Sequence, residues 1–209
     1  MRITDLLDAR SILLNASPKS KNEALDQIVD LMVKSEKIND KEAYRKQVYA
    51  REEESTTGIG EGIAIPHGKG DCVSKPGLAA MVIKNGVDFD SLDGDPVTLL
   101  FLIAAPNTED NVHLEVLSKL SMMLMDEQFT ADLLNAKSVD EFLEIVDKAD
   151  DEKSDIDVFI TMSRPSFFTR MNIKEELQKL FHRKVDLITL HENMFRSFRQ
   201  NLERDAIYI

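Results

Sequence analysis

The sequence lacks tryptophan, contains only 6% aromatic residues and has one cysteine, Cys72. A single thiol excludes an internal disulfide framework, and no cluster of cysteine and histidine suggests a zinc site, so Cys72 is interpreted as a plain thiol. No stretch approaches the roughly 18 consecutive apolar residues of a membrane-spanning helix. The N-terminal residues include acids early and have no apolar signal core. These absences predict a cytoplasmic protein with a mostly aliphatic core.

Positive charge is scarce as well, since 26 basic residues stand against 38 acidic ones and the net charge is −12. This balance argues against nucleic acid as a partner, because phosphate backbones are bound by lysine and arginine. A basic protein partner fits better, since complementary fields raise the rate of encounter. An acidic surface that serves only solubility explains the charge equally well, and both explanations stay open.

The charge is also unevenly distributed along the chain. Residues 1–150 contain 28 acidic and 16 basic residues, a net charge of −12, whereas residues 151–209 contain 10 of each and are neutral. This shift indicates two modules, and we expect a domain over residues 1–148 and an appendage over residues 149–209.

Apolar periodicity and capping signals predict the elements of the first module. Helices are expected at about 22–36, 41–53, 110–126 and 138–147, with N-caps at Ser20, Asp40 and Ser138. Tyr44, Val48 and Arg51 would share one side of the second helix. Short apolar runs predict strands at 63–65, 78–83 and 97–105, and the last is long enough to be a central strand covered on both faces.

The predicted fold class is therefore α/β, with a mixed β-sheet flanked by helices. A polar connector is expected from Ala149. Beyond it, a strand (156–161), a helix (173–182) and a strand (184–189) predict a small α/β C-terminal appendage.

A glycine-rich turn, Gly58 to Gly62, precedes a short strand that ends at Pro66 and His67. Glycines leave backbone N–H groups open to an anion, and Pro66 stiffens the backbone before the imidazole. A neutral imidazole nitrogen can attack phosphorus near neutral pH and form a high-energy phosphoramidate. His67 is thus a candidate nucleophile, while an ordinary loop histidine is the alternative on pattern alone.

Phosphoryl transfer needs in-line positioning and charge neutralisation more than it needs covalent chemistry from the protein. His113 is a candidate second group, because it lies at the start of the predicted 110–126 helix, near the positive end of the helix dipole. Arg51 is another candidate, since its guanidinium can grip an oxyanion. A histidine satisfied within the core is the competing interpretation of His113.

The segment from Ile59 to Gly68, IGEGIAIPHG, preceded by Glu52, resembles the phosphohistidine signature of the fructose/mannitol class of enzyme IIA of the sugar phosphotransferase system. The resemblance continues through GVDFDSLDGDPVTLLFLIAAP (86–106) and NVHLEVLSKL (111–120), and covers about residues 1–148. It implies that His67 is the phosphorylated histidine and that His113 hydrogen-bonds the phosphoryl group. It also implies that Arg51, Thr57 and the glycine turn with Gly68 line the site.

The same resemblance implies the partners and the cofactors. The histidine-containing phosphocarrier HPr would donate the phosphoryl group, a cysteine of enzyme IIB would accept it, and no metal, nucleotide or other cofactor would be needed. The residues of these motifs favour a fructose-type over a mannitol-type enzyme IIA, while the nitrogen-regulatory branch stays an alternative. Because Cys72 is the only cysteine and lies inside the enzyme IIA region, the acceptor would be a separate polypeptide. A homo-oligomer stays open.

The C-terminal appendage has a different resemblance. SDIDVFI (154–160) and RKVDLIT (183–189) are similar to parts of a minimal nucleotidyltransferase, which implies that Asp155, Asp157 and Asp186 could bind Mg²⁺ and a nucleotide triphosphate. The Gly-Ser turn that such enzymes place before the Asp-x-Asp strand is missing from LEIVDKADDEK (143–153). A degenerate or borrowed module that packs on the first domain or mediates association is therefore expected, and a merely polar strand entry is the other alternative.

Overall fold

The computed structural model describes residues 2–108, 112–153, 156–160, 167–181 and 185–189. It divides the chain into two compact units, Met1–Asp151 and Glu152–Ile209. None of the helices in these described ranges has the length and apolarity that crossing a bilayer requires.

The first unit is built on a mixed β-sheet. Its strands among the described residues are β1 (Leu7–Ala16), β2 (Gly58–Gly60), β3 (Ile63–Ala64), β4 (His67–Lys69), β5 (Gly77–Val87) and β6 (Val97–Ala105). Their order is β1-β5-β6-β3-β2, and β4 also pairs with β6. β5 runs antiparallel to β6, whereas β1 is parallel to β5. The predicted α/β fold with a mixed sheet is confirmed.

Strand β6 is the centre of the sheet and has the predicted bounds. On the side away from β5, β3 and then β4 pair with it in parallel, so that Ile63 faces Leu99 and His67 faces Ile103. The backbone N–H of Ile103 also donates to the carbonyl of Pro66 over 3.0 Å. The proline therefore joins two short strands on one edge of β6, and His67 opens the second of them.

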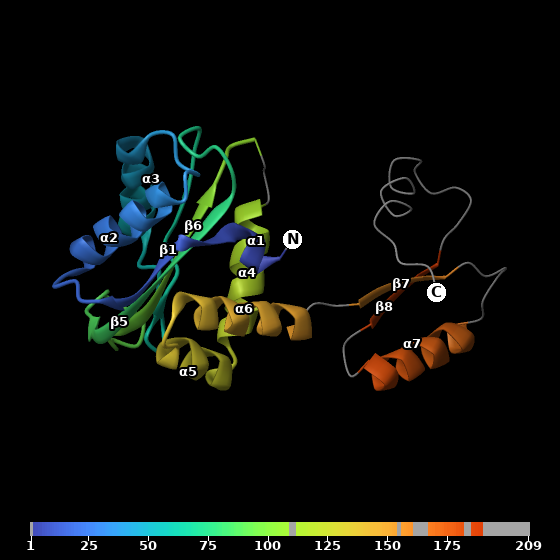
Figure 1. Cartoon of the computed structure of the whole chain (residues 1–209). Coiled ribbons are helices and arrows are strands. Elements are labelled where there is room, and N and C mark those ends of the chain that lie inside the picture. The colour runs from blue at the N-terminus through green and yellow to red at the C-terminus, as the bar shows by residue number, and fades with distance from the viewer. Residues whose placement is uncertain (1, 109–111, 154–155, 161–166, 182–184, 190–209) are drawn as a thin grey trace. The chain divides into compact units, whose positions relative to one another are not determined.

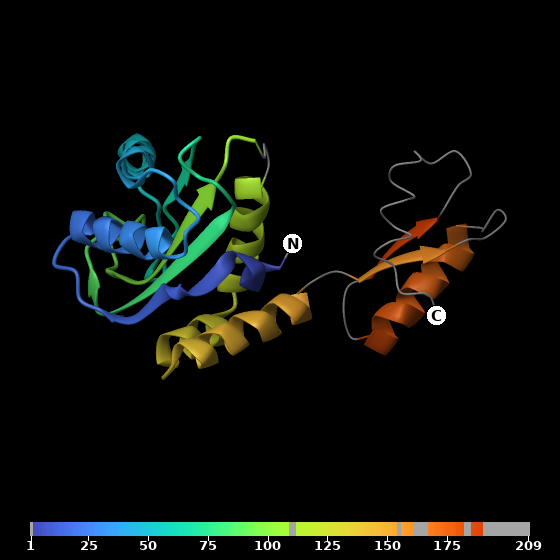
Figure 2. The ribbon, with the colours of Figure 1, turned by 45° about the horizontal axis from the view of Figure 1, so that its top comes forward.

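Helices cover both faces of this sheet (Figures 1 and 2). They are α1 (Ile3–Leu6), α2 (Lys21–Lys34), α3 (Lys41–Glu54), α4 (Val112–Leu124), α5 (Glu127–Asn135) and α6 (Val139–Lys153). Helices α2 and α3 lie on one face, whereas α4, α5 and α6 lie on the other. Each face has its own apolar core, with Ile28 and Tyr44 in the first and Leu120 and Phe142 in the second.

The predicted N-caps are confirmed. The side chains of Ser20 and Asp40 accept hydrogen bonds from the N–H groups of Glu23 and Ala43, as helix capping requires. The carboxylate of Glu23 turns to the backbone N–H of Lys19 over 2.8 Å, one residue before the cap. The cap therefore satisfies two backbone donors at the start of α2.

Five elements of the first unit were not predicted, namely α1, β1, β2, β4 and α5. Strand β1 alternates irregularly between buried and exposed positions and has register shifts against β5, so it shows no clean period of two. Helix α5 follows α4 after a short break at which Asp126 caps the next N-terminus. The single helix expected over 110–126 is thus followed by a second one.

The connector expected from Ala149 is wrong as far as Lys153, because α6 continues through it. Asp150 explains the extension, since its buried carboxylate accepts from the backbone N–H of Ile3 over 2.8 Å and lies 2.5 Å from Nζ of Lys119. A polar run was interpreted as a linker, but one of its acids has partners on two other helices.

The second unit contains strands β7 (Ile156–Ile160) and β8 (Val185–Thr189) and helix α7 (Phe167–Phe181). The two strands are parallel, and their register pairs Asp157 with Asp186. This agrees with the α/β appendage expected from the sequence, and α7 begins about six residues earlier than predicted.

Candidate functional site

His67 is half-buried at the start of β4, and both of its ring nitrogens have partners. Nδ1 lies 3.1 Å from the carbonyl oxygen of Ile65, which can only accept a hydrogen bond. Nε2 lies 3.0 Å from Nε of Arg51, which can only donate. The two contacts independently require the same neutral tautomer, with the proton on Nδ1 and a lone pair on Nε2. Nε2 is therefore the nitrogen equipped to attack an electrophile.

Arg51 comes from the last turn of α3, which packs beside β4. Besides its contact with His67, its Nη1 donates to the carbonyl oxygen and hydroxyl of Ser55 over 3.1 and 3.2 Å. These bonds hold the planar guanidinium at the edge of the imidazole. The sequence-based choice of Arg51 thus coincides with a direct contact to the candidate nucleophile.

Gly68 explains how α3 can approach β4 closely enough for this contact. A Cβ atom at position 68 would lie 2.9 Å from Cε2 of Tyr44 and 3.1 Å from Cγ2 of Val48. Tyr44 is completely buried, and its hydroxyl donates to the carbonyl of Ile103 on β6 over 3.0 Å. Gly68 therefore allows α3 to pack closely behind the histidine, and its expected place in the lining of the site stays a prediction.

Thr57 lies behind the site and is 4% exposed. Its backbone N–H and its hydroxyl donate to the two carboxylate oxygens of Glu52, over 2.9 and 2.5 Å. The Thr57 hydroxyl is thus engaged with Glu52 of α3, and the expected place of Thr57 in the lining of the site stays a prediction.

Glu52 was not singled out as a functional residue by the sequence analysis. The buried residues of α3 are Tyr44, Val48 and Glu52, at steps of four, so the buried stripe ends in a carboxylate, and Arg51 lies beside it. A charged residue at an expected core position was the signal that could have indicated it. Nζ of Lys21, at the start of α2, lies 2.8 Å from the Glu52 carboxylate. Burial lowers the pKa of Lys21, but hydrogen bonds to Glu52 and Asp90 outweigh this effect and hold the pKa above its ordinary value.

The structure places His113 in the first turn of α4. Its side chain lies outside the described part of the chain, so its predicted contact with a phosphoryl group on His67 stays a prediction.

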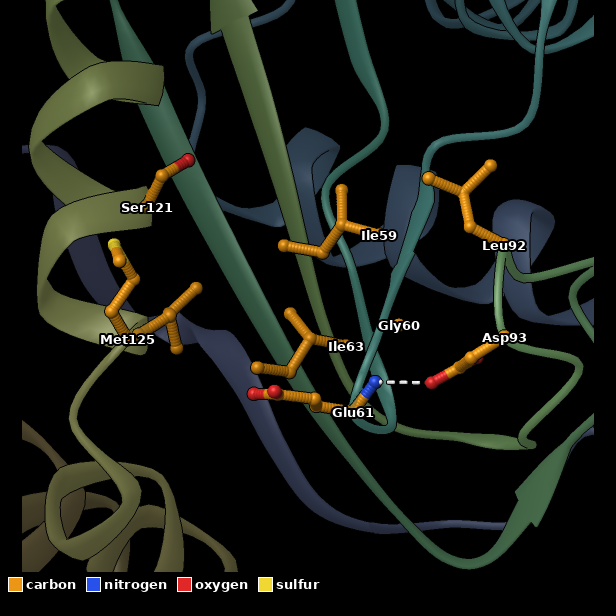
Figure 3. Close-up of a pocket in the computed structure, with 9 residues that line it drawn as sticks. Ile59, Gly60, Glu61, Ile63, Leu92, Asp93, Ser121 and Met125 are labelled. Carbon is orange, nitrogen blue, oxygen red and sulfur yellow. Dashed lines mark hydrogen bonds between the residues drawn. The ribbon is translucent and has the colours of Figure 1, made fainter.

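A pocket of about 360 Å³ opens between β2, β3 and the C-terminal end of α4 (Figure 3). Its lining residues are Ile59, Gly60, Glu61, Ile63, Leu92, Asp93, Ser121, Leu124 and Met125. Ile59, Leu92 and Met125 are 48%, 79% and 80% exposed, so its rim presents large apolar side chains. Figure 3 also shows the backbone N–H of Glu61 donating to Asp93, over 2.7 Å.

The pocket and His67 lie along one edge of β6. Ile63 pairs with Leu99 and His67 pairs with Ile103, four residues further along the same strand. At a rise of about 3.3 Å per residue, this separates them by roughly 13 Å. The pocket with its apolar rim therefore lies close to the candidate nucleophile, along the same strand edge.

In the second unit, Asp157 and Asp186 occupy paired positions on β7 and β8. Asp155 and the side chains of both other aspartates lie outside the described part of the chain. Within that part, no group of three or more metal-ligating side chains is gathered.

Comparison with known proteins matches two families, which overlap over residues 145–149. Residues 145–209 match the family described as polymerase beta nucleotidyltransferase. Residues 5–149 match the family described as phosphoenolpyruvate-dependent sugar phosphotransferase system, EIIA 2.

Two relatives of the first segment are described as fructose-specific. The fructose-specific EIIABC component of Bacillus subtilis is 46% identical over 150 residues, which are 72% of this chain and 24% of that protein. The fructose-specific EIIA component of Haloferax volcanii is 40% identical over 136 residues, which are 65% of this chain and 88% of that protein. The chain thus spans about a quarter of the length of the first relative and most of the second.

Solved structures agree with this assignment. The nitrogen regulatory protein IIA-Ntr from Neisseria meningitidis is 30% identical, with a TM-score of 0.65 over 69% of this chain and 98% of its own. The Escherichia coli complex of mannitol enzyme IIA with phosphorylated enzyme IIB gives 32% identity and a TM-score of 0.60 over 68% and 98%. With its mixed sheet, its histidine signature and these matches, the chain belongs to the type 2 enzyme IIA family of the phosphoenolpyruvate-dependent sugar phosphotransferase system, a family of phosphotransferases.

Proposed function

We propose that the chain is a phosphocarrier in which Nε2 of His67 accepts a phosphoryl group from HPr and passes it to a cysteine of a separate enzyme IIB for uptake of a fructose-class sugar. The observation that carries the proposal is the pair of contacts on the imidazole, which leaves Nε2 as the nitrogen with the lone pair. The cytoplasmic location expected from the sequence stays a prediction.

The chemistry requires one bond to form and one to break in each transfer. The Nε2 lone pair attacks phosphorus, and the bond from phosphorus to the donor's histidine nitrogen breaks, with its electron pair staying on the donor. Nδ1 keeps its proton throughout, and its hydrogen bond to the Ile65 carbonyl stabilises the phosphorylated ring. The thiolate of enzyme IIB then attacks the same phosphorus and restores the neutral imidazole.

Arg51 has a different partner in the two states of this cycle. In the structure its Nε donates to Nε2, so the guanidinium occupies the position through which phosphorus must approach. As the new bond forms, the guanidinium can transfer its hydrogen bonds to the equatorial phosphoryl oxygens, where charge builds up. His113 is proposed as a second donor to these oxygens, on the basis of the family resemblance and its place in the first turn of α4.

The exposed apolar rim of the pocket is proposed as part of the docking surface for these partner proteins. Large apolar side chains that cluster on a surface are typical of protein contacts. Glu61 and Asp93 lie among the lining residues and would favour a partner with basic groups at the edge of its own apolar patch.

The direct test is phosphorylation by phosphoenolpyruvate, enzyme I and HPr. Wild-type protein should gain one acid-labile, base-stable phosphate, and His67→Ala should abolish it. His191→Ala is a matched control, and this variant should be labelled as fully as the wild type. Labelling that survives His67→Ala would remove His67 from the proposed role.

A regulatory role is the alternative, because a nitrogen regulatory protein is among the structural matches. Transfer from phosphorylated protein to a panel of enzyme IIB proteins distinguishes the two. Rapid transfer to a fructose-class enzyme IIB supports transport. A partner that is captured only by one phosphorylation state, with no transfer to any enzyme IIB, supports regulation.

A second candidate function is metal-dependent nucleotide binding in the second unit. It is favoured by the register that pairs Asp157 with Asp186 on adjacent parallel strands, together with the family match over residues 145–209. The two aspartates, with Asp155, would hold Mg²⁺, which would neutralise the triphosphate. Calorimetric titration with ATP and Mg²⁺ tests this, and binding should be lost in Asp186→Asn. Absence of binding by the wild type at millimolar ATP would reject the proposal.

A further inference from the structure

Glu52 lies at the beginning of a continuous series of hydrogen bonds that ends on the imidazole of His67. Its carboxylate accepts from the N–H and hydroxyl of Thr57. The carbonyl of Thr57 accepts from the N–H of Ile65 over 3.0 Å. The carbonyl of Ile65 accepts from Nδ1 of His67 over 3.1 Å. From these contacts we infer that Glu52 is a positioning residue for His67, which acts together with Arg51 to set the ring tautomer that leaves Nε2 able to react.

The environment of Glu52 is that of a buried and fully engaged carboxylate. Its side chain is 6% exposed, and Nζ of Lys21 lies 2.8 Å from Oε1. Lys21 is itself fixed, because it also lies 3.2 Å from Asp90 and 4.9 Å from the centre of the Phe89 ring. A buried charge with three donors is expected to hold one geometry, since each lost donor would leave part of the charge unsolvated.

The series acts through geometry and not through electronic polarisation along one amide. The N–H and the carbonyl of Thr57 belong to two different peptide groups, and the same is true of Ile65. Glu52 therefore fixes the position of the Thr57 backbone, which in turn fixes the end of β3. The Ile65 carbonyl is then held at the place where Nδ1 of His67 must donate.

Arg51 and Glu52 are neighbours in sequence, yet they reach opposite nitrogens of the same ring. Arg51 contacts Nε2 directly, whereas Glu52 reaches Nδ1 through two backbone steps. The last turn of α3 therefore sets both the partner and the protonation of each nitrogen. A carboxylate directly on Nδ1 would change the charge of the site, and a backbone carbonyl orients the ring without doing so.

The inference rests on the proposed function for its effect on rate, but its effect on the tautomer can be measured without any phosphoryl donor. The variant is Glu52→Gln, which keeps the size of the side chain and replaces one acceptor oxygen by a donor. The matched control is Glu53→Gln, since Glu53 is the exposed neighbour on α3. Thr57→Val removes the hydroxyl donor and Thr57→Ser keeps it.

The first readout is the nitrogen-15 NMR shift of the two ring nitrogens of His67. The wild type, Glu53→Gln and Thr57→Ser should show a protonated Nδ1 and an unprotonated Nε2 at pH 8. Glu52→Gln and Thr57→Val should show shifts moved part of the way toward averaged values, because the Ile65 carbonyl no longer holds the Nδ1 proton while the contact with Arg51 still favours the same tautomer. If Glu52→Gln fails to fold, as judged by its amide spectrum, Thr57→Val carries the test. Wild-type ring shifts in a folded Glu52→Gln or Thr57→Val protein overturn the inference.

The second readout is the initial rate of phosphorylation by HPr. A small displacement of a reacting group lowers the rate of transfer strongly, so Glu52→Gln should be phosphorylated about tenfold to a hundredfold more slowly than the wild type. Glu53→Gln should stay within about twofold of the wild-type rate. If the wild type is phosphorylated and Glu52→Gln is phosphorylated at the same rate, the inference is overturned. The wild type could also show the predicted tautomer of His67, with the predicted changes in the variants, and yet never be phosphorylated. That result would refute the proposed function and leave the positioning inference supported.

Discussion

Nε of Arg51 donates a hydrogen bond to Nε2 of His67 over 3.0 Å. Because a guanidinium has no acceptor, the bond uses the lone pair that a nucleophilic nitrogen needs. In the proposed mechanism, a positive group therefore occupies the place that phosphorus would take on Nε2. The guanidinium would then be in place to neutralise the charge of an arriving phosphoryl group.

Replacing Arg51 by lysine should slow phosphorylation of His67. A single ammonium group cannot contact Nε2 and the Ser55 carbonyl with the same planar geometry, and it offers fewer directed donors to three phosphoryl oxygens. We expect Arg51→Lys to reduce the initial rate by roughly a hundredfold. A quenched time course of labelling by phosphorylated HPr measures this initial rate. Arg45→Lys, on the same helix and paired with Asp26, is the control and should keep the wild-type rate.

Adding a methyl group at Gly68 should loosen the contact between β4 and α3. The new Cβ would overlap Tyr44 and Val48, both of which are fully buried. We expect Gly68→Ala to lower the free energy of unfolding by about 1–3 kcal/mol. Urea denaturation followed by circular dichroism measures it. Gly70→Ala meets Sγ of Cys72 at 3.2 Å as its nearest atom and should cost less. Equal losses in the two variants would contradict this explanation.

Removing the Asp150 carboxylate should release the N-terminal helix from α4 and α6. Asp150 is 2% exposed, and its loss leaves the N–H of Ile3 and the ammonium group of Lys119 without this partner. We expect Asp150→Ala to destabilise the first unit by about 3 kcal/mol. Asp147→Ala removes a half-exposed pair with Arg2 and should cost less than about 1 kcal/mol. Chemical denaturation compares the two, and hydrogen exchange at Ile3 should accelerate only in Asp150→Ala.

Asp26 should contribute to the pH dependence of stability. Its pKa lies below the ordinary value, chiefly because Arg45 donates hydrogen bonds to it, with Tyr49 adding another and partial burial opposing them. A depressed folded-state pKa stabilises the fold above the unfolded-state pKa of about 3.9, and this contribution is lost as pH falls through the folded-state pKa. The stability difference between wild type and Asp26→Asn should be constant from about pH 6 to pH 5, and should shrink below about pH 4. A difference that stays constant down to about pH 2 would contradict this assignment.

Several features could be predicted from local sequence because their causes are local. Strand β6 has the expected bounds, since an uninterrupted apolar run ends at Pro106. The caps at Ser20 and Asp40 depend on one side chain and the N–H three residues later. Strand β1 and helix α1 escaped prediction, because their pairing and burial come from partners more than 60 residues away.

The glycine-rich signature with His67 determined the family of this chain by itself. Its residues are contiguous, so the motif can be identified from the order of the amino acids alone. The sequence could also place Arg51 near the site by resemblance. Only the tertiary structure decided which ring nitrogen carries the proton, that Gly68 serves the packing of α3, and that Glu52 is tied to the histidine through Thr57 and Ile65. These depend on atoms from α2, α3, β3 and β4 meeting in space, and no spacing along the chain specifies such a meeting.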